Sequence, residues 1–122
     1  MSLSNYGEGI ILDALLALMP FYVALSTADP GEDGSTIAEP VEMGYARKES
    51  SAFSPTDNVI SNTAIVDFLV STGAWETITH FALFDAAVDG NILGSAELAA
   101  PLNVVEGKSV QFGIGALTLT AG

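Results

Sequence analysis

The chain has 122 residues, a length that suits one domain; 49% of them are hydrophobic, and 15 acidic residues against 3 basic ones give a formal net charge of −12. Because phosphate groups are bound by clustered lysine and arginine, this balance excludes nucleic acid and anionic membrane as expected partners and favours a partner with a basic surface. The absence of cysteine excludes thiolate chemistry and disulfides, and no segment has the pattern of a signal peptide or a membrane span, so we expect a soluble protein made in a cytoplasm.

Residues 5–19, NYGEGIILDALLALM, are predicted to form a helix. Asn5 can cap its first turn together with Glu8, and Pro20 ends it. Because Asp13 is the only polar residue in the second half of the segment, the helix must be covered on several sides. It therefore packs between subunits, beneath the end of a sandwich, or against its own core, and the sequence leaves these alternatives open.

After the helix the hydrophobic pattern changes to a period of two, which is typical of β-strands. FYVALST, residues 21–27, alternates between two faces, whereas WETITHFALFD, residues 75–85, is apolar on both faces, as expected for a strand inside a sandwich. The Asp89-Gly90 pair predicts a hairpin after the second of these strands. Further strands are predicted at residues 45–50, 63–70, 91–98 and 109–120, with a turn at 54–58 and a bulge near Gly115.

One helix and six to eight short strands with frequent turn signals predict a mainly β protein. We expect a single β-sandwich or jelly-roll-like barrel over residues 1–122, with one N-terminal α-helix at 5–19 and the sandwich at 20–122. The sequence contains no internal repeat and no low-complexity tract that would indicate a second unit.

The segment STADPGEDGSTIAEP, residues 26–40, is rich in acids, glycine and proline. Asp29, Glu32 and Asp33 are calcium candidates, because calcium prefers oxygen ligands. However, the spacing of an EF-hand fails, since glycine and proline occupy its third and twelfth positions, so a calcium site is the minor alternative. The favoured interpretation is two consecutive tight turns, in which glycine supplies positive φ and aspartate accepts hydrogen bonds from backbone amides.

The single histidine, His80, has no evident role as a general base, because Glu76 and Asp85 are candidates only through proximity in the sequence. The motifs of P-loops, dinucleotide-binding folds, serine hydrolases and zinc peptidases are absent from the sequence. One histidine without any cysteine does not suit a zinc site. We therefore expect no enzymatic activity, no catalytic residue and no cofactor.

Two long blocks carry a family resemblance. FYVALSTADPGEDGSTIAEPVEMGYARKE, residues 21–49, and WETITHFALFDAAVDGNILGSAEL, residues 75–98, are similar to blocks in a group of small tailed-phage structural proteins, and the ending VQFGIGALTLT also looks like theirs. The resemblance departs at Glu42 and Met43, where relatives often have more glycine. It implies a component of the virion and not an enzyme.

Members of this family are labelled tail-fibre-like or minor structural proteins, and some small β proteins of this kind decorate phage heads. We therefore expect a capsid decoration, or cement, protein on the head surface that bridges the major capsid protein as a homo-oligomer, with a trimer as the guess. The alternative is a tail-fibre or minor tail component. A further alternative is a calcium- or carbohydrate-binding receptor module, in which Trp75, Tyr22 and Tyr45 stack on sugars, although core packing is favoured for Trp75.

The expected contact surface combines the helix with the acidic loop. An apolar helix needs a neighbour, and an acidic edge suits docking on a basic surface of another virion protein. The residues expected to contact another subunit or the capsid are Ile11, Leu15 and Leu18 on the helix, and Asp29, Pro30, Glu32, Asp33 and Glu39 on the loop.

Overall fold

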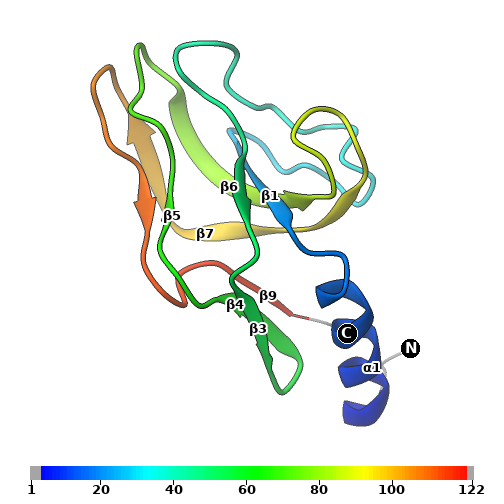
Figure 1. Cartoon of the computed structure of the whole chain (residues 1–122). Helices are drawn as coiled ribbons and strands as arrows, with labels where there is room; N and C mark the ends of the chain where they lie inside the picture. Colours follow the sequence, from blue (N-terminus) through cyan, green and yellow to red (C-terminus); the bar gives the residue numbers. More distant parts are fainter. Residues whose placement is uncertain (1–3, 121–122) are drawn as a thin grey trace.

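The computed structural model describes residues 4–120, except for the side chains of Asn5 and Glu8, and it shows a mainly β protein with one helix (Figure 1). The elements are α1 (Asn5–Leu16), β1 (Phe21–Ser26), β2 (Lys48–Ser50), β3 (Phe53–Thr56), β4 (Val59–Asn62), β5 (Val66–Asp67), β6 (Glu76–Phe84), β7 (Ile92–Val104), β8 (Gln111–Phe112) and β9 (Thr118–Thr120). The predicted mainly β fold is therefore confirmed.

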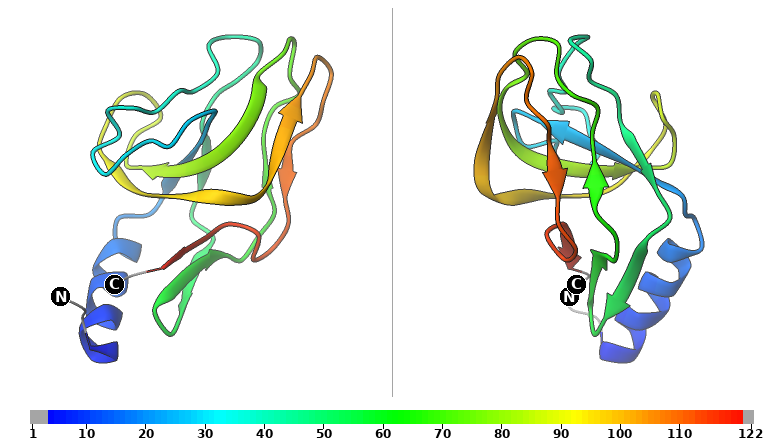
Figure 2. Two further views of the ribbon diagram at one scale, coloured as in Figure 1. Left: turned by 180° about the vertical axis from the view of Figure 1, so that it is seen from behind. Right: turned by 60° about the vertical axis from the view of Figure 1, so that its left-hand side comes forward.

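The strands form three antiparallel groups, in the orders β2-β1-β6-β7, β3-β4-β9 and β5-β8. These groups pack around a shared apolar core in a sandwich-like arrangement (Figures 1 and 2). Within residues 4–120 the groups do not close into a barrel, so the barrel form of the prediction is wrong. The reason is that β7 ends the four-stranded sheet without pairing to β8 or β9.

Helix α1 confirms the predicted N-terminal helix but differs from the prediction at both ends. Its cap is Ser4, whose side-chain oxygen accepts a hydrogen bond from the Gly7 amide at 3.1 Å, so the cap predicted at Asn5 is wrong by one residue. The capping role predicted for Glu8 falls on a side chain outside the described part of the structure. The helix ends at Leu16, three residues earlier than predicted.

Strand β6 is the centre of the four-stranded sheet, because it pairs with β1 on one side and with β7 on the other. The predicted burial of both its faces is confirmed. On the inner face Phe81 and Leu83 enter the main core, and on the outer face Ala82 and Phe84 belong to a second, smaller cluster. The loop after β1 covers this outer cluster, since its Ile37 packs there.

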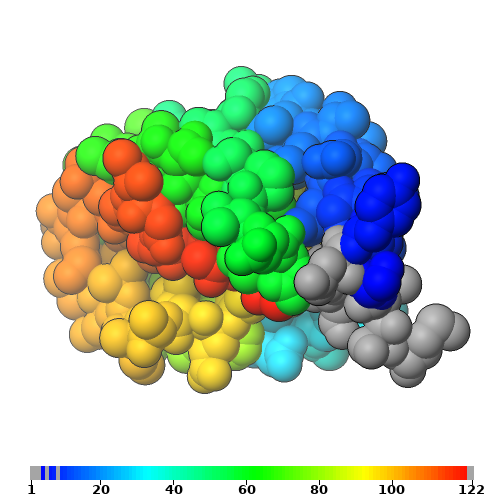
Figure 3. Space-filling model, turned by 90° about the horizontal axis from the view of Figure 1, so that it is seen from below, coloured from blue at the N-terminus to red at the C-terminus, as the bar shows by residue number. Residues whose placement is uncertain are grey.

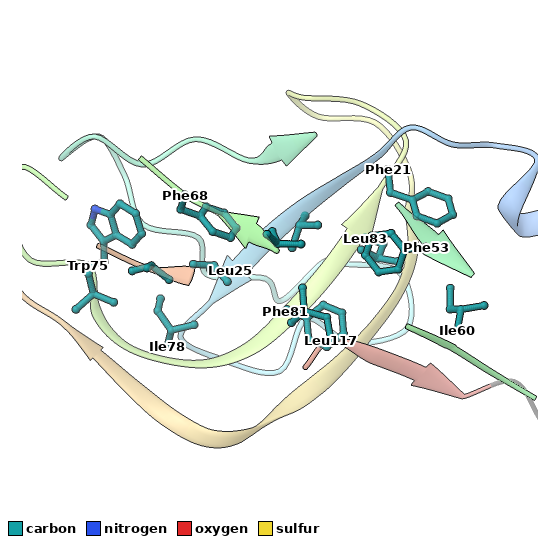
Figure 4. Packing of buried hydrophobic residues seen from close by; sticks show 14 of the residues in the cluster. Phe21, Leu25, Phe53, Ile60, Phe68, Trp75, Ile78, Phe81, Leu83 and Leu117 are labelled. Atoms are coloured by element: carbon teal, nitrogen blue, oxygen red, sulfur yellow. The ribbon is translucent and has the colours of Figure 1, made fainter. Parts of the chain in front are cut away.

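The main core draws side chains from all three groups of strands and from α1 (Figure 4). Phe21 and Phe53 meet edge to face across two sheets, with ring centroids 5.4 Å apart. Trp75 is 2% exposed, and its indole N–H donates to the Met43 carbonyl oxygen at 2.8 Å. The core-packing role favoured for Trp75 is therefore confirmed.

Strand β7 is longer than predicted and strongly bent (Figure 2). The hairpin predicted before it is confirmed, with positive φ at both Asp89 and Gly90. His80 pairs with Glu97 and Ile78 with Leu102, so residues 98–101 of β7 stand opposite Thr79 alone. Such a bulge bends a strand and tolerates a proline, which explains Pro101 at this place.

Several predicted elements need correction. The turn expected at residues 54–58 is confined to the tip of a β3–β4 hairpin, where Asp57 has a φ of 55°. The strands expected at 45–50 and 63–70 shrink to β2 and β5. The segment 109–120 is two strands in different sheets, and Gly115, with a φ of 80°, lies in the turn between them. The bulge predicted near Gly115 is therefore wrong, because the chain turns there and passes to another sheet.

Candidate functional site

The acidic loop after β1 contains the two tight turns that were predicted. The Oδ1 atoms of Asp29 and Asp33 each accept a hydrogen bond at 3.0 Å, from the amides of Gly31 and Ser35 respectively. A glycine with a φ of 75° follows in each turn, at positions 31 and 34. Hydrogen bonds from Ser35 hold the pKa of Asp33 below its ordinary value, and the bond from the Ser35 hydroxyl has a larger effect than the bond from its amide.

The calcium alternative receives no support from this geometry. Asp29, Glu32 and Asp33 do not converge, since within residues 4–120 no group of three histidine or acidic side chains could hold a metal ion. Two of the three carboxylates already accept backbone hydrogen bonds inside the turns. The turns therefore account for the aspartates without an ion.

Ser26, at the end of β1, fastens both ends of the acidic loop. Its buried hydroxyl donates to the Ala28 carbonyl oxygen at 2.6 Å and accepts from the Ala28 and Ala38 amides at 3.2 and 3.0 Å. The Thr27 amide also donates to the Ala38 carbonyl oxygen at 3.0 Å. The Ser26 hydroxyl and this backbone bond together hold the two ends of a loop of more than ten residues at the end of β1.

A second fastening, which we call the Glu39 clamp, joins Glu39, Tyr45 and Arg47. One Glu39 oxygen accepts from the Tyr45 hydroxyl at 2.6 Å and from Arg47 Nε at 2.9 Å, and the other accepts from Arg47 Nη2 at 2.9 Å. Burial first, and the bond to Glu39 second, raise the pKa of Tyr45. The bond to Glu39 raises the pKa of Arg47 as well. The carboxylate predicted at Glu39 to contact a partner is thus engaged inside this chain.

Arg47 extends the Glu39 clamp to the β6–β7 hairpin. Its Nη1 donates to the carbonyl oxygens of Ala86 and Asp89 at 3.0 and 2.7 Å, and its guanidinium lies 3.8 Å from the centre of the Phe84 ring. A depression of about 400 Å³ lies beside the clamp, but Glu39 and Arg47, two of the charged residues that line it, already bond to each other. We therefore regard this end of the molecule as fastened rather than open.

Helix α1 places the other predicted contacts. Leu12 is 3% exposed in the main core, and Leu15 packs against that core half-buried. The outer side of α1 is largely apolar apart from Asp13, with exposed fractions of 81% at Tyr6, 53% at Ile10 and 47% at Ile11, and Leu18, in the turn after the helix, is 54% exposed. The helix thus covers its own core with one face and leaves the other free, at the rim of the molecule beside β3 and β4 (Figure 3). Among the described residues, no helix is long and apolar enough to span a membrane.

An apolar groove of about 230 Å³ separates α1 from β7 and β9. Ile11 and Leu15, two of the predicted helix contacts, line one side of it, and Leu93 and Leu119 line the other. Leu18 does not belong to its lining. The structure therefore brings two of the predicted contact residues to a site that the sequence did not reveal.

The aromatic residues considered for sugar binding are engaged elsewhere. Trp75 is buried, and the Tyr45 ring packs edge to face against it with centroids 5.4 Å apart. The Tyr22 hydroxyl donates to Glu49 at 2.9 Å, and this bond raises the pKa of Tyr22. These three side chains do not form an exposed stacking platform.

His80 is not joined to the acids that were weighed for it. Its Nδ1 lies 2.8 Å from the hydroxyl oxygen of its neighbour Thr79. Glu76 and Asp85 lie roughly 13–16 Å from it along the extended strand. Asp85 instead accepts from the Asn91 amide at 2.7 Å and from the Asn91 side chain at 3.0 Å, and these bonds lower its pKa.

Two further buried polar residues that sequence reasoning missed also fasten loops. Asn62 accepts from the Leu117 amide at 3.0 Å and donates to the Gly113 carbonyl oxygen at 2.8 Å, across the turn between β8 and β9. Ser71 donates to the Val105 carbonyl oxygen at 2.6 Å, in the turn after β7. The only feature of the sequence that could have indicated them is their position, because each is a small polar residue at the end of a run in which apolar residues alternate.

These features define a small sandwich-like β protein whose loops are fastened by internal polar contacts. A family model described as Podophage GP4 fiber I protein gp80 matches residues 2–120, so the chain belongs to this family of phage fibre proteins. A search of curated proteins gives no match. The expected kinship with phage structural proteins is confirmed at the level of the family. The match agrees better with the tail-fibre alternative than with head decoration, which it does not confirm.

Proposed function

We propose that the protein is a structural component of a phage tail fibre and that it works by assembly rather than catalysis. The observation that carries this proposal is the match of residues 2–120, nearly the whole chain, to a family of podophage fibre proteins. An assembly role needs no catalytic residue and no cofactor, which agrees with the separation of His80 from Glu76 and Asp85.

The proposed contact with another virion protein is made through the outer face of α1. Tyr6 and Ile10 expose more than half of their side chains there, as does Leu18 in the turn that follows the helix. Burial of one such side chain against a partner stabilises an assembly by about 1.5–3 kcal/mol. The net charge of −12 favours a basic partner surface. We also predict that the protein forms a homo-oligomer, with a trimer as the guess. Light scattering of the purified protein measures its molar mass and so tests this prediction.

Head decoration is the second candidate function. It is favoured by the acidic charge, which would suit a basic shell of capsid subunits, and by the small size of the protein. In that role the exposed acids of the loop, Asp29, Glu32 and Asp33, would face the capsid, whereas Pro30, which was also predicted as a contact, is buried in this chain. The family match gives this candidate no specific support.

The two candidates differ in where the protein lies on the particle. We suggest labelling virions of the encoding phage with gold-conjugated antibody raised against this chain and imaging them by electron microscopy. Gold confined to the tail or its fibres supports the proposal. Gold in icosahedral order over the head would overturn it in favour of decoration, and virions without any label would overturn both.

A further inference from the structure

Strand β7 leaves one side of its backbone without a partner strand. It pairs with β6 along one side, and it is the last strand of its sheet in the described structure. The nearest contact from β9 is made by a side chain, since Leu119 packs over Gly94, and β9 does not pair with β7. The outward N–H and C=O groups of an edge strand pair either with water or with another extended backbone.

The free edge of β7 is more regular in its first half than in its second. Residues 94–97 follow β6 without interruption and span about 13 Å at 3.3 Å per residue, and Ile92 resumes the pairing beyond one extra residue, Leu93. The second half contains the bulge at 98–101 and Pro101, which are two features that protect an edge against pairing. The first half has no proline, its irregularity is confined to Leu93, and Glu97 is its only charge.

At Gly94 and Ser95 this edge lies between two depressions on opposite sides of the sheet. On the inner side is the apolar groove, whose walls include Ile11 and Leu119. On the outer side is a depression of about 380 Å³ beside the acidic loop, lined by Asp29, Gly31, Glu32 and Ile92, which we call the acidic groove. Gly94 and Ser95 line both.

The alternation of a β-strand matches this arrangement. In a strand added beside β7, successive side chains would point to opposite faces of the sheet, one into the apolar groove and the next into the acidic groove. Glu97 lies on the acidic side as well, because it is two residues from Ser95, which pairs with Ala82 of the outer face. The edge therefore offers backbone pairing together with two different side-chain environments.

We propose that residues 92–97 of β7 bind an extended strand of a partner protein in which apolar and basic side chains alternate. Charge selects this occupant over a second copy of the chain, because pairing two copies would bring acidic grooves together in a chain of net charge −12. Backbone pairing supplies affinity, and the two grooves supply register and specificity. The proposal goes beyond the fibre function and holds wherever on the virion the protein lies.

The test uses the full chain, labelled with ¹⁵N, and a capped seven-residue peptide of alternating valine and lysine. We expect saturable binding with amide shifts centred on residues 92–97. A peptide of the same sequence with every backbone amide N-methylated has no N–H left to donate on either edge, and we expect at least tenfold weaker binding. A peptide of alternating valine and glutamate should also bind at least tenfold more weakly. Equal binding of the N-methylated peptide, or shifts centred elsewhere, would overturn the proposal.

Two pairs of matched variants separate the grooves. Glu32→Lys should weaken binding at least fivefold, whereas Glu106→Lys, an exposed acid in the turn after β7, should change it less than twofold. Ile11→Asp, in the apolar groove, should weaken binding at least fivefold, whereas Ile10→Asp, exposed to a similar degree outside the groove, should not. Circular dichroism checks that each variant is folded.

Equal effects within either pair would contradict the proposal that the bound strand places side chains in both grooves. Concentration-dependent dimers of the unliganded chain, with shifts at residues 92–97, would show that a second copy is the occupant and would overturn the basic partner. Because these measurements use purified protein and peptide, they can succeed or fail independently of the gold labelling that tests the fibre function.

Discussion

The loop end of the molecule and the seam between α1 and β7 meet their surroundings in opposite ways. At the loop end Ser26 and the Glu39 clamp satisfy polar groups from two loops within the chain itself. At the seam an apolar helix face and a strand edge lie open. The contrast teaches that the density of charge alone does not mark a contact surface, because several charged groups at the loop end, Glu39 and Arg47 among them, already bond to each other.

The largest effect is expected from breaking the Glu39 clamp. Arg47→Leu leaves Glu39 without its ion pair and releases the β6–β7 hairpin, so it should lower the free energy of unfolding by about 3–5 kcal/mol. The measurement is urea denaturation. Lys48→Leu, at the exposed next residue, is the control and should cost less than about 0.5 kcal/mol. Equal losses would mean that the clamp does not stabilise the loop end.

Substitutions on the two faces of α1 should differ in their effect on the free energy of unfolding by almost as much. Leu12→Ala removes a buried side chain from the core and should cost about 2–5 kcal/mol. Ile10→Ala, on the exposed face, should cost less than about 0.5 kcal/mol in the isolated protein. Thermal unfolding of both variants gives the comparison. A large loss of stability in Ile10→Ala would show that Ile10 packs in the core of the chain. It would contradict the account of an open face on α1.

A smaller effect is expected at Ser26. Ser26→Ala leaves the half-buried Ala38 amide without its acceptor and should cost about 1–3 kcal/mol. Ser51→Ala, at an exposed position, is the matched control. Limited proteolysis adds a local readout, since cleavage within residues 27–40 should become faster only in the Ser26 variant. Unchanged cleavage would mean that other contacts hold the loop.

The smallest effect is a pH dependence at the β6–β7 hairpin. Because the bonds from Asn91 lower the pKa of Asp85 in the folded state, the carboxylate adds stability above its ordinary pKa of 3.8 and loses it as the pH falls through the lower, folded value. Asp85→Asn should therefore be less stable than the parent at pH 7, with the difference shrinking below about pH 3.8. A difference that is constant from pH 7 to pH 2.5 would contradict this origin. Asp57→Asn, in the other hairpin, is the control.

Local patterns predicted β1, β6 and the hairpin at Asp89-Gly90, because alternation and turn chemistry are written in neighbouring residues. They missed the β3–β4 hairpin, since its proline and small polar residues are also typical of a loop. The Glu39 clamp depends on Arg47 meeting Ala86, 39 positions away, and no local pattern encodes that contact. The same holds for the open edge of β7, which follows from strand order.

Hydrogen exchange, compared between the isolated protein and the same protein in assembled virions, tests most directly whether the seam is the contact surface. The account predicts slower exchange in virions for the amides of residues 92–97, with the acidic loop at 27–40 little changed because its amides are bonded internally. Protection confined to the acidic loop, with the β7 edge exchanging as fast as in the isolated protein, would contradict it.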